Sequence, residues 1–318
     1  MRNSIYLAVC AVLLAGCVSE EERLMKRADE LCRYIPDHEL LERSKDYMTE
    51  DFYTALDTMF HHLPEHEAMD HEWLYYFVTG NGGTMADYEV KSVKKTDETH
   101  AIATIHVRQI WEDGSWADEE NDIEEHYLYM EKAGKEWLMS DFDDHKKDCL
   151  RHIAISRREQ ALRDAMCEYL VNEIGVQYRQ GELCLPTLLI VAEESADNEG
   201  TNDSTAVNVW CDTWVYWYSV SGDTLKTVSG GCHSGKMTVA DKNGRMSVTA
   251  FEQTTDGAGN AASAERIFDK HYDIYQNMHS NAGVREAVRQ EQLREYVRRY
   301  GLPYRYYQDY GQDAVALE

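Results

Sequence analysis

Residues 206–220, AVNVWCDTWVYWYSV, decide the fold of the second half of the chain. Successive side chains of a β-strand point to opposite faces of its sheet, so positions of equal parity share a face. Four large rings have equal parity in this stretch and are expected on one face: Trp210, Trp214, Tyr216 and Tyr218. Such a row is typical of a core, and it also fits the lining of a pocket in which ligands stack on rings.

Turn signals on both sides of this stretch predict an antiparallel sheet. Ser221-Gly222 and Asn243-Gly244 are dipeptides that favour two-residue hairpin turns. Around them we expect four strands, at residues 183–191, 206–220, 225–240 and 245–251. Two helices, from about residue 263 and about residue 284, are expected to close the chain.

The first half shows the same order of elements, with helices before strands. Residues 20–77 favour helices, which Asn81-Gly82-Gly83 would end. Ala133-Gly134 indicates a hairpin, and strands are predicted at residues 101–111, 123–130 and 136–142. A helix is then expected from about residue 141 to residue 170. We therefore predict an α+β fold of two domains, residues 25–150 and 151–318, each with N-terminal helices packed on a curved antiparallel sheet and the second with extra C-terminal helices.

The N-terminus has the pattern of an exported chain. Arg2 precedes an apolar run at residues 5–16, which is too short to span a bilayer and typical of a secretory signal. Leu14-Ala15-Gly16-Cys17 resembles the lipobox of bacterial lipoproteins. That resemblance implies cleavage after Gly16 and lipidation of Cys17, which would make the chain an outer-membrane lipoprotein that faces the periplasm or the cell surface. Residues 17–24 are predicted as an acidic tether, and residues 18–22 within them, VSEEE, also resemble the surface-export tract of some Gram-negative lipoproteins.

The order of helices and strands resembles the nuclear-transport-factor-2-like group, also called SnoaL-like or cystatin-like. The resemblance covers residues 25–145 and, more weakly, residues 155–255. It implies a cone in which helices pack into a curved sheet. Catalytic members of this group use acidic or histidine residues inside the cone, and no position of this chain matches them residue by residue. The resemblance therefore assigns no catalytic residue here.

Charge narrows the range of partners. The chain carries 32 basic and 58 acidic residues, a net charge of −26, which repels phosphate backbones. Nucleic acid is therefore excluded as a partner. The expected partners are the membrane, through the N-terminal lipid, and an envelope protein, peptide or glycan. No cofactor is expected.

Six cysteines remain once Cys10 leaves with the signal and Cys17 takes the lipid. An even number in an exported chain favours disulfide bonds. If Ser221-Gly222 is the hairpin turn, Cys211 and Cys232 lie ten residues from it on either side and face each other. A bulge at Gly230-Gly231 would place them on opposite faces. The remaining pairs, by proximity alone, are expected to be Cys32 with Cys149 and Cys167 with Cys184.

Three further patterns in the sequence have the residue types of ligand sites. His62-Leu63-Pro64-Glu65-His66 contains the HxxEH pattern of zinc peptidases, with Glu67, Asp70 or His71 as a third ligand, although Pro64 favours a polar turn instead. The acidic residues 118–125 and 193–203 suit calcium, or are solvated strand connections. Residues 230–236, GGCHSGK, fit the spacing of a phosphate-binding loop, but the segment that follows favours a strand, so a glycine bulge is the simpler interpretation.

These observations favour a non-catalytic module of the cell envelope that binds or assembles with a ligand not identified by the sequence. The alternative is an enzyme that acts on a small apolar ligand or a glycan in a cone-shaped pocket. The two differ in what surrounds the pocket, because an enzyme needs titratable groups that point into it.

Overall fold

The structure is a computed structural model that describes residues 19–35, 41–63, 84–110, 123–196 and 206–317. It divides into two compact units, residues 1–156 and 157–318. The division falls inside helix α6 (His145–Tyr169), the helix that also contains the predicted domain boundary. Helices and largely antiparallel sheets occur in both units, so the predicted α+β class is confirmed, with its extra C-terminal helices.

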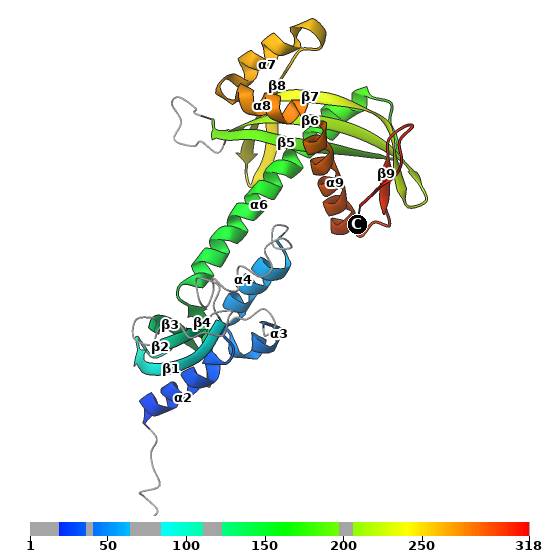
Figure 1. Cartoon of the computed structure of the whole chain (residues 1–318). Helices are drawn as coiled ribbons and strands as arrows, with labels where there is room; N and C mark the ends of the chain where they lie inside the picture. Colours follow the sequence, from blue (N-terminus) through cyan, green and yellow to red (C-terminus); the bar gives the residue numbers. More distant parts are fainter. Residues whose placement is uncertain (1–18, 36–40, 64–83, 111–122, 197–205, 318) are drawn as a thin grey trace, which may run out of the picture. The chain divides into compact units, whose positions relative to one another are not determined.

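The first unit is a four-stranded antiparallel sheet in the order β1-β2-β3-β4, with helices packed on it (Figure 1). The helices of its described residues are α2 (Glu20–Cys32), α3 (Leu41–Ser44), α4 (Glu50–His61) and the first part of α6. The strands are β1 (Thr84–Lys95), β2 (His100–Ile110), β3 (Ile123–Ala133) and β4 (Glu136–Phe142). Alternate residues of β2 are buried, Ala101, Ala103, Ile105 and Val107, which confirms the predicted strand.

The acidic tract after the lipobox is partly helical. Glu20, Glu21 and Glu22 form the first turn of α2, and the Ser19 hydroxyl accepts a hydrogen bond from the Glu22 amide. Negative side chains stabilise this end of a helix because the helix dipole is positive there. Leu24 is buried in the first core. Residues 20–24 of the predicted tether are therefore helical, and the extent of the tether stays a prediction.

The second unit has a six-stranded sheet in the order β10-β9-β7-β6-β5, with β8 paired to β7. Its strands are β5 (Leu183–Ser195), β6 (Ala206–Ser221), β7 (Thr224–Lys242), β8 (Arg245–Gln253), β9 (Tyr306–Gln308) and β10 (Val315–Ala316). The four strands predicted from the sequence are confirmed. Three helices follow β8 where two were predicted: α7 (Asn260–Phe268), α8 (Tyr272–Ser280) and α9 (Ala282–Arg299).

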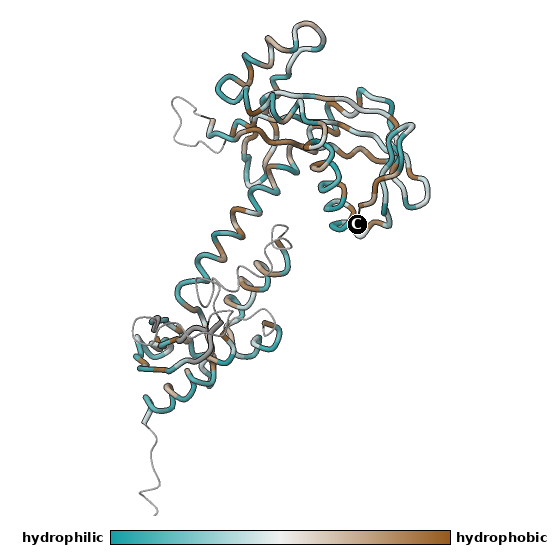
Figure 2. Tube along the Cα trace, in the orientation of Figure 1, coloured by the Kyte–Doolittle hydropathy of each residue, from teal (hydrophilic) through white to brown (hydrophobic). Residues whose placement is uncertain are grey.

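Two layers of side chains cover the second sheet. On one face, the later part of α6 packs on alternate residues of β6, among them Val209, Cys211 and Val215. On the opposite face, α7, α8 and α9 pack over the ring-bearing residues of the same strand. Helix α7 packs on β7, α8 packs on β5 and β6, and α9 packs on β5 (Figure 1). The strands between these layers are hydrophobic along much of their length (Figure 2).

Candidate functional site

The predicted row of rings lies on one face of β6, as parity required. Trp214, Tyr216 and Tyr218 join the cluster around α9, and Trp210 joins the cluster around α7. Tyr218 is fully buried, and the Trp210 indole donates a hydrogen bond of 2.7 Å to the Ile267 carbonyl. The shared face is confirmed, and these rings serve as core on that face. Their predicted role in lining a ligand site stays a prediction.

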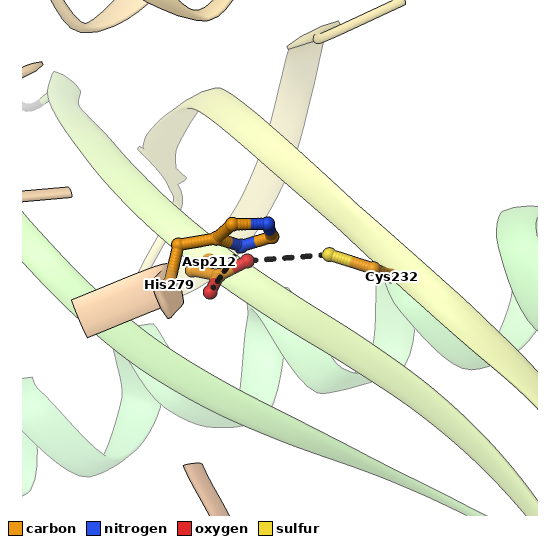
Figure 3. Close-up of side chains that lie close together, drawn as sticks. All are labelled: Asp212, Cys232 and His279. Atoms are coloured by element: carbon orange, nitrogen blue, oxygen red, sulfur yellow. Dashed lines mark hydrogen bonds and ion pairs between the residues drawn. The ribbon is translucent and has the colours of Figure 1, made fainter. Parts of the chain in front are cut away.

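An acidic residue interrupts this row. Asp212 has the parity of Trp210 and Trp214, so it points toward the helices, and its side chain is 1% exposed. Two further polar residues reach it from other elements, Cys232 on β7 and His279 near the end of α8 (Figure 3). Asp212, Cys232 and His279 are here named the Asp212 cluster. One potential ligand atom from each lies within 4.8 Å of the other two.

Both carboxylate oxygens of Asp212 have partners. Oδ1 accepts a hydrogen bond of 2.6 Å from the Ser234 hydroxyl and one of 3.3 Å from the Cys232 thiol. Oδ2 lies 3.0 Å from Nδ1 of His279, in an ion pair when the imidazole is protonated. The Tyr275 hydroxyl is buried in the neighbouring cluster and has no hydrogen-bond partner among the described residues.

The electrostatics of the Asp212 cluster follow from burial and these contacts. Burial favours the neutral form of Asp212, but the hydrogen bonds from His279 and Ser234 outweigh it, so the pKa of Asp212 lies below its ordinary value. The hydrogen bond to Asp212 raises the pKa of His279. Burial, together with the charge of Asp212, raises the pKa of Cys232 to about 12. The thiol is therefore protonated at neutral pH and a poor nucleophile.

The predicted disulfide between Cys211 and Cys232 is wrong. The turn is Gly222-Asp223, one residue later than expected, because Ser221 pairs with Thr224. A second shift occurs in β7 between Thr227 and Ser229, so Cys211 faces Gly235 and Cys232 faces Trp214. An odd total offset turns the two side chains to opposite faces. Cys211 lies in the core beneath α6, whereas Cys232 joins the Asp212 cluster.

The other predicted disulfides are not formed either, since the six cysteines of the described chain are free thiols. Cys32 and Cys149 both lie in the first core. Cys167 and Cys184 both line a cavity in the second unit. Burial raises the pKa of Cys32 and of Cys149 to about 12 each, so these thiols have the character of core residues.

That cavity has a volume of about 480 Å³ and lies between α6, the edge strand β5 and α9. It is here named the β5 groove. Its lining mixes apolar and charged side chains of these elements, such as Leu185, Tyr296 and Glu295, with Val171 just beyond the end of α6 and Tyr300 just beyond the end of α9. The side-chain amide of Gln292 bonds both the N–H and the C=O of Leu188, at 2.9 and 2.8 Å. None of the Asp212 cluster lines the groove.

The histidines predicted as zinc ligands are only partly described. His66 and His71 lie outside the described residues, as do residues 118–122 of the first acidic segment. The His62 side chain is 65% exposed and lies 3.5 Å from Asp57. Residues 230–236 are part of strand β7, as predicted, and form no helix start. The bulge is at Val228, two residues before the glycines.

Comparison with known proteins gives little. No family model and no curated protein matches the chain. One solved structure, described as "Ntf2 like protein involved in plasmid conjugation", is 8% identical and covers 74% of this chain and 98% of its own, with a TM-score of 0.22. A likeness at that TM-score carries no argument about this chain. Among the described residues, no helix is both long and apolar enough to cross a membrane.

Proposed function

We propose that this chain is a lipid-anchored protein of the cell envelope whose second unit binds an extended peptide segment of a partner in the β5 groove. The anchor is supported by the lipobox-like residues that end at Cys17. An NTF2-like classification of the units and an outer-membrane location belong to the same proposal. The first is supported by the order of helices and antiparallel strands.

The observation that carries the peptide proposal is that β5 is the edge of its sheet and also borders the groove. An edge strand offers backbone N–H and C=O groups to an added strand. Leu188 shows which groups point outward, because Gln292 bonds both of them from outside the sheet. By parity, Cys184 and Pro186 also direct their backbone groups outward. Pro186 lacks an N–H, which a strand tolerates at an outward position of an edge.

The chemistry of the groove suits such a segment. Tyr296 and Tyr300 lie on the α9 side, and Tyr300 is 57% exposed, so rings are available for apolar or aliphatic side chains of a peptide. Three arginines and three carboxylates line the groove, so the preference for a basic segment comes from the net charge of the whole chain, −26. The enzyme alternative has less support, because the acid–base cluster of Asp212 lies apart from the groove.

Photo-cross-linking of the lipidated protein in its membranes tests the proposal. A photoreactive residue at Tyr300 should cross-link to one segment of one partner, mapped by mass spectrometry. The matched control is Tyr310, which is 99% exposed and does not line the groove. Val171→Arg fills the groove and should abolish the Tyr300 cross-link while the fold, checked by circular dichroism, is kept. Equal capture at both positions, or capture that survives Val171→Arg, would reject the groove as the binding site.

A further inference from the structure

We propose that the Asp212 cluster is a binding site for a borderline-soft divalent metal, zinc in particular. Its three residues offer a carboxylate oxygen, a thiol sulfur and an imidazole nitrogen, the donor types that bind zinc in proteins. This site is separate from the β5 groove, so it does not depend on the proposed peptide binding.

The three donors come from three elements. Asp212 and Cys232 are 20 residues apart on neighbouring strands, and His279 is 67 residues beyond Asp212 on α8. Figure 3 shows all three side chains directed at one point between the strands and the helix. The pairing of β6 with β7 and the packing of α8 on β6 therefore bring these donors together, although they are far apart in the sequence.

The spacing of the donors fits tetrahedral coordination. Bond lengths of about 2.0–2.3 Å at tetrahedral angles separate neighbouring ligand atoms by about 3.3–3.6 Å. The Cys232 sulfur lies 3.3 Å from one oxygen of Asp212, and His279 Nδ1 lies 3.0 Å from the other. All three ligand atoms lie within 4.8 Å of one another, so approaches of up to about 1.3 Å would bring them to the spacing of a tetrahedral site.

The surroundings supply the remaining features of a metal site. The Ser234 hydroxyl donates to Asp212 and fixes the carboxylate, the role that an outer-shell partner plays. The His279 side chain is 39% exposed, which gives an ion access and leaves room for a water as fourth ligand. Asp212 is a buried carboxylate, and a divalent ion would neutralise it together with a Cys232 thiolate. Coordination releases the thiol proton, and any imidazolium proton, to solvent.

One neighbouring charge opposes the ion. Arg285 on α9 stacks over the Trp214 ring at 4.3 Å and acts electrostatically on both Cys232 and His279. Removing this charge with Arg285→Gln should tighten metal binding severalfold. A cluster that served only to hold α8 on the sheet would show no such gain.

The test uses the chain without residues 1–16, reduced, stripped with a chelator and titrated with Zn²⁺ or Co²⁺. We expect a Co²⁺ complex with a thiolate-to-metal charge-transfer band, which a site made of histidines alone cannot give. Cys232→Ser and His279→Gln should weaken Zn²⁺ binding by more than about 100-fold, because loss of outer-shell partners alone costs about 10–100-fold. Ser234→Ala should fall in that lower range.

Cys184→Ser and His233→Gln are matched controls. Cys184 is a half-buried thiol of the same unit, and His233 adjoins Cys232 but bonds Tyr178 and Gln253 instead. Both variants should keep the band and the affinity. Absence of the band in the wild-type chain, its survival in Cys232→Ser, or its loss in Cys184→Ser would each overturn the proposal. His279→Gln keeps the test valid if Cys232→Ser misfolds, because His279 is partly exposed and its replacement leaves the strands intact.

Discussion

The buried Arg289 and its partner Asp309 should respond unequally to mutation. The Arg289 side chain is 1% exposed, whereas that of Asp309 is 40% exposed. Arg289 donates two hydrogen bonds of 2.9 Å to Asp309 and others to Tyr218 and Thr227, and its guanidinium lies 4.0 Å from the centre of the Tyr216 ring. Asp309→Ala leaves a charge buried without its partner, whereas Arg289→Met leaves a carboxylate that water can reach.

The expected magnitudes follow from that asymmetry. An uncompensated buried charge costs about 3–5 kcal/mol, and we expect about 3 kcal/mol for Asp309→Ala because Glu286 remains 3.6 Å from Arg289. Arg289→Met should cost about 1–2 kcal/mol, because the lost charge-assisted hydrogen bonds contribute about 1.5–3 kcal/mol each and relief of the guanidinium's desolvation offsets most of that loss. The double variant should resemble Arg289→Met alone.

Labelling of buried thiols measures the loss of unfolding free energy separately in each unit. Cys211 is buried in the second core and Cys32 in the first, so each reacts only when its own unit opens. A loss of about 3 kcal/mol should speed labelling of Cys211 by about 150-fold. As a control, Asp164→Ala breaks the exposed pair with Arg299 and should cost less than about 1 kcal/mol. The reasoning is refuted if Asp309→Ala destabilises no more than Arg289→Met does.

Four other changes test the lipid anchor, a close approach of two strands, the ionisation of Asp309 and the division into two units. Cys17→Ser should leave the precursor without an acyl label and free of the membrane; membrane fractionation that is unchanged would contradict this. Gly235→Ala should lower the unfolding free energy in a denaturant titration by about 1–3 kcal/mol, because an added Cβ would lie 2.1 Å from a backbone oxygen of β8. Gly244→Ala is the control, because an added Cβ there meets open space and only backbone strain can destabilise the variant. Hydrogen bonds from Arg289 lower the pKa of Asp309, so the contribution of this pair to the unfolding free energy is complete above pH about 4 and declines as the pH falls through the lowered pKa. The difference in unfolding free energy between wild type and Asp309→Ala should therefore narrow below pH about 4 and stay constant above it. Residues 157–318 should fold alone, shown by a sigmoidal melt, and a fragment that stays unfolded would mean one core rather than two.

The strands were predictable because alternation and turn residues are local signals. The hairpin predicted at Asn243-Gly244 is formed with those two residues as its turn, because Lys242 pairs with Arg245. Strand β1 was missed, because its exposed positions carry lysine and glutamate and two irregularities break its pairing with β2. Charged edge strands of this kind resist unwanted pairing, but they lack the apolar alternation by which strands are recognised.

Register was less predictable than strand position. A single residue decides whether Gly222 is the first or the second residue of the turn, and Gly222 has a φ of +65° that either place would accept. No glycine or turn residue stands at Val228 to indicate the bulge there, and the glycines at positions 230 and 231 lie outside the bulge. A Cβ on Gly230 would lie 2.2 Å from the Val215 carbonyl oxygen, so the glycine permits close approach of β6. The pairing of Cys211 with Cys232 depended on both details.

The candidate metal site shows where inference from sequence ends. Parity alone places Asp212 among Trp210 and Trp214, on a face that must be covered for those rings to be buried. A carboxylate on such a face requires hydrogen-bond or charged partners, so a polar cluster near Asp212 was a physical necessity. The sequence did not show which residues form that cluster, because His279 lies 67 residues beyond Asp212 and reaches it only through the packing of α8 on the sheet. A lone acidic residue inside a row of rings is therefore the signal that could have located the site, while the identity of its partners needed the fold.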